Sequence, residues 1–134
     1  MKTSGNLILL FSRFSLFIVF FWFGLLKIIG TSPANPLVKN LFEKTVPFFK
    51  FETFILLFGA YEMILGLIFL IPRLEKIAII LFIPHMITTF LPLFFLKAST
   101  WQGLLTPTLE GQYIIKNLVL IALALNLAFP NPKK

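Results

Sequence analysis

Four long apolar blocks constrain the fold of this chain more than any other feature of its sequence. A helix needs about 20 mainly apolar residues to cross the hydrocarbon core of a bilayer. Four segments reach that length, at about residues 7–29, 53–71, 76–96 and 113–129. Because these blocks lack the polar face that a helix of a soluble protein presents to water, we predict an all-α protein, a four-helix transmembrane bundle in up-down-up-down order.

The composition agrees with a membrane protein. Of the 134 residues, 58% are hydrophobic and only 13% are charged, whereas soluble domains are about 25% charged. The first apolar block continues past Gly24, which is longer than the apolar region of a secretory signal, so we interpret it as a retained membrane helix. No internal repeat or linker is visible, and residues 1–134 are predicted to form one integral membrane domain.

The connections between the spans carry further structural signals. The segment between the first two spans predicts an amphipathic or re-entrant element, with Leu37, Leu41 and Phe42 facing lipid. The second and third spans are joined by the short turn from Pro72 to Lys76, which makes them antiparallel neighbours. Before the fourth span lies a polar loop, which we expect to cover the end of the bundle.

Several classes of site are excluded by the residues that the chain lacks. The chain has no cysteine and one histidine, which excludes disulfides, thiol chemistry and His-rich metal clusters, and no haem, flavin or metal motif is present. Nucleophile triads and phosphate-binding loops are also missing, so any catalytic residue is unknown. The net charge of +7 comes from residues dispersed at the ends of the spans, which suits anionic lipid headgroups better than nucleic acid.

The basic residues of the short loops also give an orientation. Arg73 and Lys76 lie in the shortest loop, and loops of this kind carry an excess of basic residues on the cytoplasmic side. With four spans, Lys2, Lys133 and Lys134 fall on the same side. We therefore expect a multi-pass protein of the bacterial inner membrane with both termini in the cytoplasm.

Charged residues inside the spans are the main functional candidates, because each costs at least ~2.5–3.5 kcal/mol to insert. At about 1.5 Å per residue, Glu62 lies about 13–14 Å from the membrane face next to Ile71. His85 lies at about the same depth, counted from Lys76. Arg13 is nearer that face, and its long side chain is expected to reach inward to the carboxylate.

Two glycines indicate which way the acid faces. Gly59, Glu62 and Gly66 are spaced by three and four residues, so they share one face of a helix. Small residues allow a neighbouring helix to approach closely. We therefore predict that this face, with Gly59 and Gly66 as packing positions, points into the bundle.

A secondary polar cluster is predicted at the opposite membrane face. It consists of Lys27, Glu110, Lys116 and Asn117, and we expect the loop before the fourth span to cap the bundle near Lys27 and Lys116. For the two lysines the alternative is that their side chains snorkel to the headgroups.

Two interpretations of Arg13, Glu62 and His85 stay open. The three side chains can line a central polar pocket that holds the head of a quinone-like or lipid-like amphiphile, or that handles a proton. Alternatively, they form an ion pair that only braces the helices. In that case His85, which follows Pro84, donates to a carbonyl that the proline leaves free.

Three segments of the chain resemble the DoxX-like family of small four-helix membrane proteins: RFSLFIVFFWFGLLKI, GAYEMILGLIFLIPR and EGQYIIKNLVLIALAL. The shared features are a G-x-x-K (Gly24, Lys27), a G-x-x-E (Gly59, Glu62), a Pro-Arg turn after it, and an acidic residue and an amide opening the fourth helix. PTLEGQYIIKNLVLI is the most specific stretch. The resemblance covers most of residues 10–127.

The resemblance implies a four-helix membrane fold and a modest set of functions. Members are similar to the small membrane subunit of a thiosulfate:quinone oxidoreductase and to components of membrane oxidoreductase complexes, and distant eukaryotic relatives act in receptor assembly. Arg13, Lys27, Glu62 and Glu110 match recurrent polar positions of the family. Because this chain has no cysteine and no flavin or haem motif, electron transfer would need a partner subunit or a bound quinone.

The resulting expectation is an integral membrane accessory subunit whose polar pocket binds a quinone-like or lipid-like amphiphile, within a membrane oxidoreductase complex. Its partners would be the lipid bilayer, a membrane or peripheral redox subunit, or further copies of the chain, with no nucleic acid. The alternative is a structural or assembly factor that binds the transmembrane helix of a partner. The sequence does not decide whether the chain is an enzyme.

Overall fold

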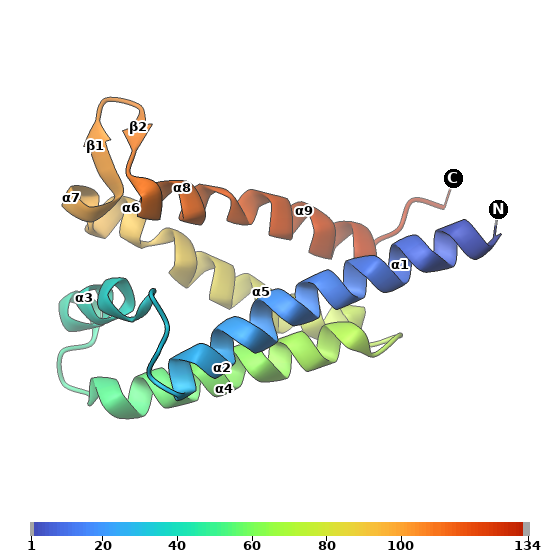
Figure 1. Ribbon diagram of the computed structural model, residues 1–134, viewed down its shortest axis with the longest axis horizontal. Coiled ribbons are helices and arrows are strands. Elements are labelled where there is room, and N and C mark those ends of the chain that lie inside the picture. The colour runs from blue at the N-terminus through green and yellow to red at the C-terminus, as the bar shows by residue number, and fades with distance from the viewer. Residues whose placement is uncertain (1, 133–134) are drawn as a thin grey trace.

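Four apolar helical spans form an antiparallel bundle in the computed structural model, which describes residues 2–132 (Figure 1). The spans are Thr3–Ile28, Phe51–Leu70, Glu75–Phe95 and Leu109–Ala128. Each is long and apolar enough to cross a membrane, so the predicted four-helix transmembrane bundle is confirmed. The first span begins and the fourth ends at the same end of the bundle (Figure 1). The orientation in the membrane stays a prediction, and Lys133 and Lys134, which entered it, lie outside the described residues.

The first span is one continuous helix with a change of winding in its middle. It consists of α1 (Lys2–Phe17), a π-helical turn η1 (Ile18–Trp22) and α2 (Phe23–Ile28). Gly30 follows with a φ of +78°, a left-handed conformation that glycine adopts without a steric penalty, and the helix ends there. Short π-helical turns often occur at functional sites, and this one faces α4.

The second and third spans are antiparallel neighbours, as predicted from their short connection. The second span is α4 (Phe51–Leu70), and the third consists of α5 (Glu75–Phe90) and α6 (Pro92–Phe95). Ile71 is extended, with a ψ of 116°, because the following Pro72 disfavours a helical conformation. The helix α5 continues through Pro84.

A short helix, α3 (Asn35–Thr45), confirms the predicted helical element between the first two spans. However, the prediction that Phe42 faces lipid is wrong. Its ring is buried and lies 4.9 Å from the ring of Phe54 and 5.7 Å from that of Phe51, centroid to centroid. Lys44 donates to the carbonyl oxygen of Phe95 at 3.3 Å. The helix therefore lies at this end of the bundle (Figure 1), and it packs the ring of Phe42 on α4.

The loop before the fourth span is ordered by a small hairpin. It contains α7 (Lys97–Thr100) and the antiparallel strands β1 (Trp101–Gly103) and β2 (Thr106–Pro107). The fourth span follows as α8 (Leu109–Ile115) and α9 (Asn117–Ala128). Thr108 caps α8, because its hydroxyl oxygen accepts a hydrogen bond from the backbone N–H of Gly111.

The core lies along the bundle axis and receives apolar side chains from all four spans: Leu16, Phe20, Leu65, Phe69, Ala78, Ile79, Phe82, Met86, Ala124 and Leu127. The outward faces of the same helices are also apolar, with many large exposed side chains. An apolar exterior of this kind is stable in lipid and not in water. Three polar side chains continue the core toward the end that carries α3, and they form the candidate site.

Candidate functional site: a buried lysine–glutamate–histidine cluster

Three titratable side chains from three helices meet inside the bundle. Lys27 on α2 donates to Oε2 of Glu62 on α4 at 2.8 Å. The Nε2 atom of His85 on α5 lies 2.7 Å from Oε1 of the same carboxylate. All three residues are buried, with exposed fractions of 6% for Lys27, 4% for Glu62 and 7% for His85. Glu62 therefore joins the first three spans, with one oxygen for each neighbour.

Two facing glycines bring the helices close enough for this contact. A Cβ atom added to Gly24 would lie 2.5 Å from the carbonyl oxygen of Gly59, and one added to Gly59 would lie 2.7 Å from the carbonyl oxygen of Gly24. Only hydrogen fits at either position. Lys27 and Glu62 each come three residues after one of these glycines, so they lie on the same helix faces as the glycines. The G-x-x-K and G-x-x-E patterns thus meet as a matched pair.

Gly66 forms a second close approach, nearer to the C-terminal end of α4. A Cβ atom there would lie 2.9 Å from the backbone nitrogen of Phe21, within the π-helical turn. Gly59, Glu62 and Gly66 are all buried, which confirms the prediction that this face of α4 points into the bundle.

Aromatic rings enclose the cluster. The ring of His85 is stacked on that of Phe58 at 5.2 Å and meets the ring of Phe20 edge-on at 5.3 Å. The ammonium of Lys27 lies 5.6 Å from the centre of the Phe58 ring, within the range of a cation–π interaction. Tyr61 donates to the carbonyl oxygen of Leu81 and so links α4 to α5 beside the cluster. Because these rings exclude water, the attraction between the charges is only weakly screened.

The geometry also restricts the proton positions. An ionised carboxylate only accepts hydrogen bonds, so the tautomer of His85 that fits an ionised Glu62 carries its proton on Nε2, 2.7 Å from Oε1. The Nδ1 atom of His85 lies 3.4 Å from the hydroxyl oxygen of Thr89, which donates to the carbonyl oxygen of His85 at 2.9 Å. The two ring nitrogens of His85 thus face Glu62 and Thr89, and the predicted donation to a carbonyl left free by Pro84 is wrong.

The predicted pairing of Arg13 with Glu62 is also wrong. Arg13 forms an ion pair with Glu75 at the start of α5, and it donates to the carbonyl oxygen of Phe69 at 3.2 Å. The reason is the direction of helical side chains, which tilt toward the N-terminus of their own helix. In the first span that direction carries Arg13 outward, to the turn that follows α4. Arg13 there satisfies carbonyl groups that the end of α4 leaves free.

The same tilt carries Lys27 inward. Lys27 lies near the C-terminal end of the first span, so its side chain extends back toward the centre of the bundle and reaches Glu62. Snorkelling to the headgroups would require the opposite direction. Lys27 therefore belongs to the buried cluster, and its predicted place in the secondary cluster is wrong.

The remaining members of the secondary cluster are on the surface of the fourth span. Glu110 is exposed in the first turn of α8. The ammonium of Lys116 lies 5.3 Å from the centre of the Tyr113 ring, and Asn117 donates to the carbonyl oxygen of Tyr113. These contacts are local to α8 and α9. The end of the bundle near Lys27 is instead covered from α3, where the Phe42 ring contacts the Phe54 ring, which is stacked on that of Phe58.

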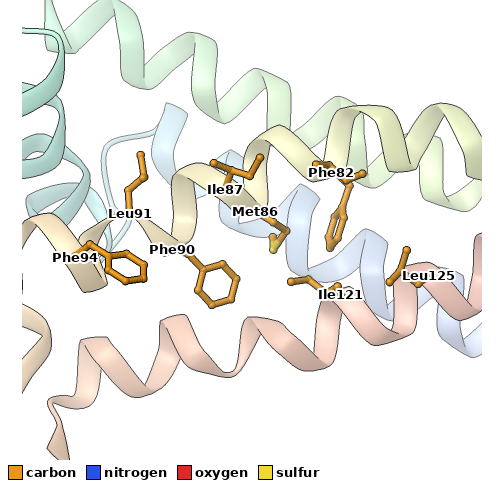
Figure 2. Close-up of a pocket in the computed structure, with 9 residues that line it drawn as sticks. Phe82, Met86, Ile87, Phe90, Leu91, Phe94, Ile121 and Leu125 are labelled. Carbon is orange, nitrogen blue, oxygen red and sulfur yellow. The ribbon is translucent and has the colours of Figure 1, made fainter. Parts of the chain in front are cut away.

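A groove lies between α5–α6 and α9 (Figure 2), and its lining includes no member of the buried cluster. Its volume is about 490 Å³, within the usual range for a small-molecule site. Figure 2 shows Phe90, Met86 and Ile121 directed into the space between the helices. The groove is lined by Phe82, Ile83, Met86, Ile87, Phe90, Leu91, Phe94, Ile121 and Leu125. None of Arg13, Glu62 and His85 is part of this lining.

Neither a search for metal-ligand groups nor comparison with known proteins assigns a function to the site. Within residues 2–132, no group of three or more His, Asp or Glu side chains is placed to hold a metal ion. No family model, no curated protein and no solved structure matches the chain. The resemblance to the DoxX-like family therefore stays a prediction, carried by the residues quoted above.

Proposed function

We propose that the chain is an integral membrane accessory subunit that binds the apolar tail of a quinone-like or lipid-like amphiphile in the groove between α5 and α9. The observation that carries this proposal is the groove itself, about 490 Å³ in volume and lined by aliphatic and aromatic side chains. A site with this lining selects ligands by shape and apolar contact. Membership of an oxidoreductase complex is part of the proposal and follows from the resemblance.

In this proposal the buried cluster braces the fold and does not receive the head of the ligand. Both oxygens of Glu62 are already engaged. A ligand that bonded to Glu62 would have to displace Lys27 or His85 and leave it buried without its partner, which costs several kcal/mol. Satisfied hydrogen bonds inside a closed cluster therefore favour a structural role for Glu62.

The test is a thermal-shift measurement on the purified protein with a panel of quinones and phospholipids. A ligand at 100 times its Kd stabilises the folded state by about 2.7 kcal/mol. Ile121→Trp should fill the groove and abolish the shift. Val119 lies on the same helix with 70% of its side chain exposed, so Val119→Trp is the matched control and should keep the shift. No shift with any member of the panel, or a shift that survives Ile121→Trp, contradicts the proposal.

The second candidate is an assembly factor that binds the transmembrane helix of a partner. A buried cluster that only stabilises the fold is equally consistent with this function. A pull-down from native membranes distinguishes the two. A stoichiometric partner that is lost in Ile121→Trp and retained in Val119→Trp, together with no response to the ligand panel, would assign the groove to a protein.

A further inference from the structure

The hairpin before the fourth span ends in two leucines that are almost fully exposed. Leu104 and Leu105 form the connection between β1 and β2, and their exposed fractions are 92% and 86%. The described residues have no contact that covers these side chains. Loop tips of proteins usually carry polar residues and turn formers, so the pair requires an explanation.

The turn itself is made of residues that do not favour it. Leu105 has a φ of +53°, a left-handed conformation in which turns prefer glycine or asparagine. The hydroxyl of Thr106 donates to the carbonyl oxygen of Leu104 at 3.0 Å and closes the turn. Two apolar side chains thus occupy positions where local turn chemistry favours other residues.

The root of the hairpin is firmly held. Trp101 donates from Nε1 to the carbonyl oxygen of Leu93 at 3.0 Å, and Thr108 donates to the carbonyl oxygen of Ser99 at 2.6 Å. Gly111 packs so closely on the carbonyl oxygen of Thr100 that no side chain could replace its hydrogen. These contacts fix the direction in which the tip points.

That direction lies across the bundle axis. The hairpin connects the end of the third span at Phe95 to the start of the fourth at Leu109, so its root is at the membrane surface. Figure 1 shows it extending sideways from α7 and α8, beyond the outline of the bundle. No charged residue occurs between Lys97 and Glu110, so the hairpin carries no charge that would keep its tip in water.

A second apolar loop lies at the same end of the molecule. Phe48 and Phe49 precede α4, with exposed fractions of 88% and 46%, and Lys50 follows them. Figure 1 places this loop, between α3 and α4, at the end of the bundle that carries the hairpin. These two loops are far apart in the sequence, and both expose apolar side chains at the same end of the bundle. Both are therefore expected to lie in the same environment, the membrane interface.

We propose that the tip formed by Leu104 and Leu105 is a membrane anchor, inserted into the boundary between headgroups and acyl chains of the leaflet at that end of the bundle. The insertion depth typical of interfacial apolar segments is about 5–10 Å. Trp101 and Lys97 at the root are residue types that favour the headgroup level. The anchor fixes the depth of the α6–α8 end of the bundle, independently of what the groove binds.

The test uses site-directed spin labels, which the absence of native cysteine makes straightforward. Leu104→Cys carries a nitroxide at the tip, and Asn40→Cys carries one on the exposed polar side of α3 as the control. The labelled proteins are placed in vesicles of phosphatidylethanolamine and phosphatidylglycerol. At position 104, oxygen should relax the label more than a water-soluble nickel complex does, and at position 40 the order should be reversed.

Two results would overturn the proposal. The first is a nickel accessibility at position 104 as high as at position 40, which would place the tip in water. The second is exclusion of both reagents with spin–spin broadening that disappears on dilution with unlabelled protein, which would place the tip against a second copy. If Leu104→Cys fails to give the helical circular dichroism of the unmodified chain, Leu105→Cys provides the same measurement.

Discussion

A methyl group at Gly59 should separate the first two spans and weaken the buried cluster. In Gly59→Ala the new Cβ atom would lie 2.7 Å from the carbonyl oxygen of Gly24 and 2.9 Å from Cγ1 of Ile28. The backbone oxygen cannot move without its helix, so the helices must part by several tenths of an ångström. The contact between Lys27 and Glu62, now 2.8 Å, would lengthen toward the limit of a hydrogen bond.

The size of the effect follows from three terms. Overpacking costs about 1–3 kcal/mol, and weakening a charge-assisted hydrogen bond costs about 1.5–3 kcal/mol. Replacing glycine by alanine inside a helix returns about 1 kcal/mol. We therefore expect Gly59→Ala to lower the free energy of unfolding by about 1.5–5 kcal/mol.

The assay is reversible unfolding in mixed micelles, followed by circular dichroism. Gly5→Ala is the matched control, because a Cβ atom at Gly5 meets nothing within 4 Å and the helix-propensity gain is the only term left. It should be as stable as the unmodified chain or slightly more stable. If Gly59→Ala is as stable as Gly5→Ala, the two helices do not depend on this close approach and the reasoning is refuted.

Three further predictions concern other contacts of the fold. Arg13→Lys should lower the free energy of unfolding by about 1–2 kcal/mol, because lysine cannot bond to Glu75 and a carbonyl of α4 in the same planar fork; chemical denaturation of the two proteins measures it. Gly111→Ala should displace the hairpin, since its Cβ atom would collide with a backbone carbonyl, and limited proteolysis should then cut the loop faster than in the unmodified chain. His85→Phe should lower stability by about 1–3 kcal/mol, because Glu62 loses a donor, and its melting temperature should be lower than that of the chain with His85.

The four-helix architecture could be predicted from the sequence because the hydrophobicity of the four segments determines it. The predicted ends of the four spans agree with the observed helices to within two residues, except that the first and fourth spans, Thr3–Ile28 and Leu109–Ala128, each begin four residues before the predicted start. The face of α4 that points into the bundle could also be predicted, because the spacing of Gly59, Glu62 and Gly66 places them on one side of the helix. The equal depth of His85 and Glu62 in the membrane could also be predicted, by counting residues along two helices that are joined by a short turn.

The partner of Glu62 was missed for a geometric reason. The depth of a Cα atom does not include the tilt of its side chain along the helix, so Arg13 was paired with Glu62 and Lys27 was placed in the secondary cluster at the opposite membrane face. A signal was present in the sequence, because the G-x-x-K and G-x-x-E patterns have equal spacing and lie on antiparallel helices. Pairing the two patterns would have brought Lys27 to Glu62.

The burial of Phe42 and the presence of the hairpin could not be predicted from the sequence, for a different reason. An amphipathic helix at a membrane surface can turn its apolar side to lipid or to protein, and the periodicity of α3 is the same in both cases. The tip residues Leu104 and Leu105 do not favour a turn, so the hairpin has no local signal. Its shape depends on tertiary contacts at Trp101 and Thr108.

Lys27 and Glu62 form a buried pair that holds the bundle together, and a double-mutant cycle measures how strongly they are coupled. Lys27→Met, Glu62→Gln and the double variant are unfolded in the same mixed micelles as the unmodified chain. Each single change leaves a buried group without its partner and should cost about 3–5 kcal/mol, while the double variant should recover part of that loss. We expect a coupling energy of about 2–3 kcal/mol. A value below about 0.5 kcal/mol, as for an exposed pair, would show that the pair does not hold the bundle together.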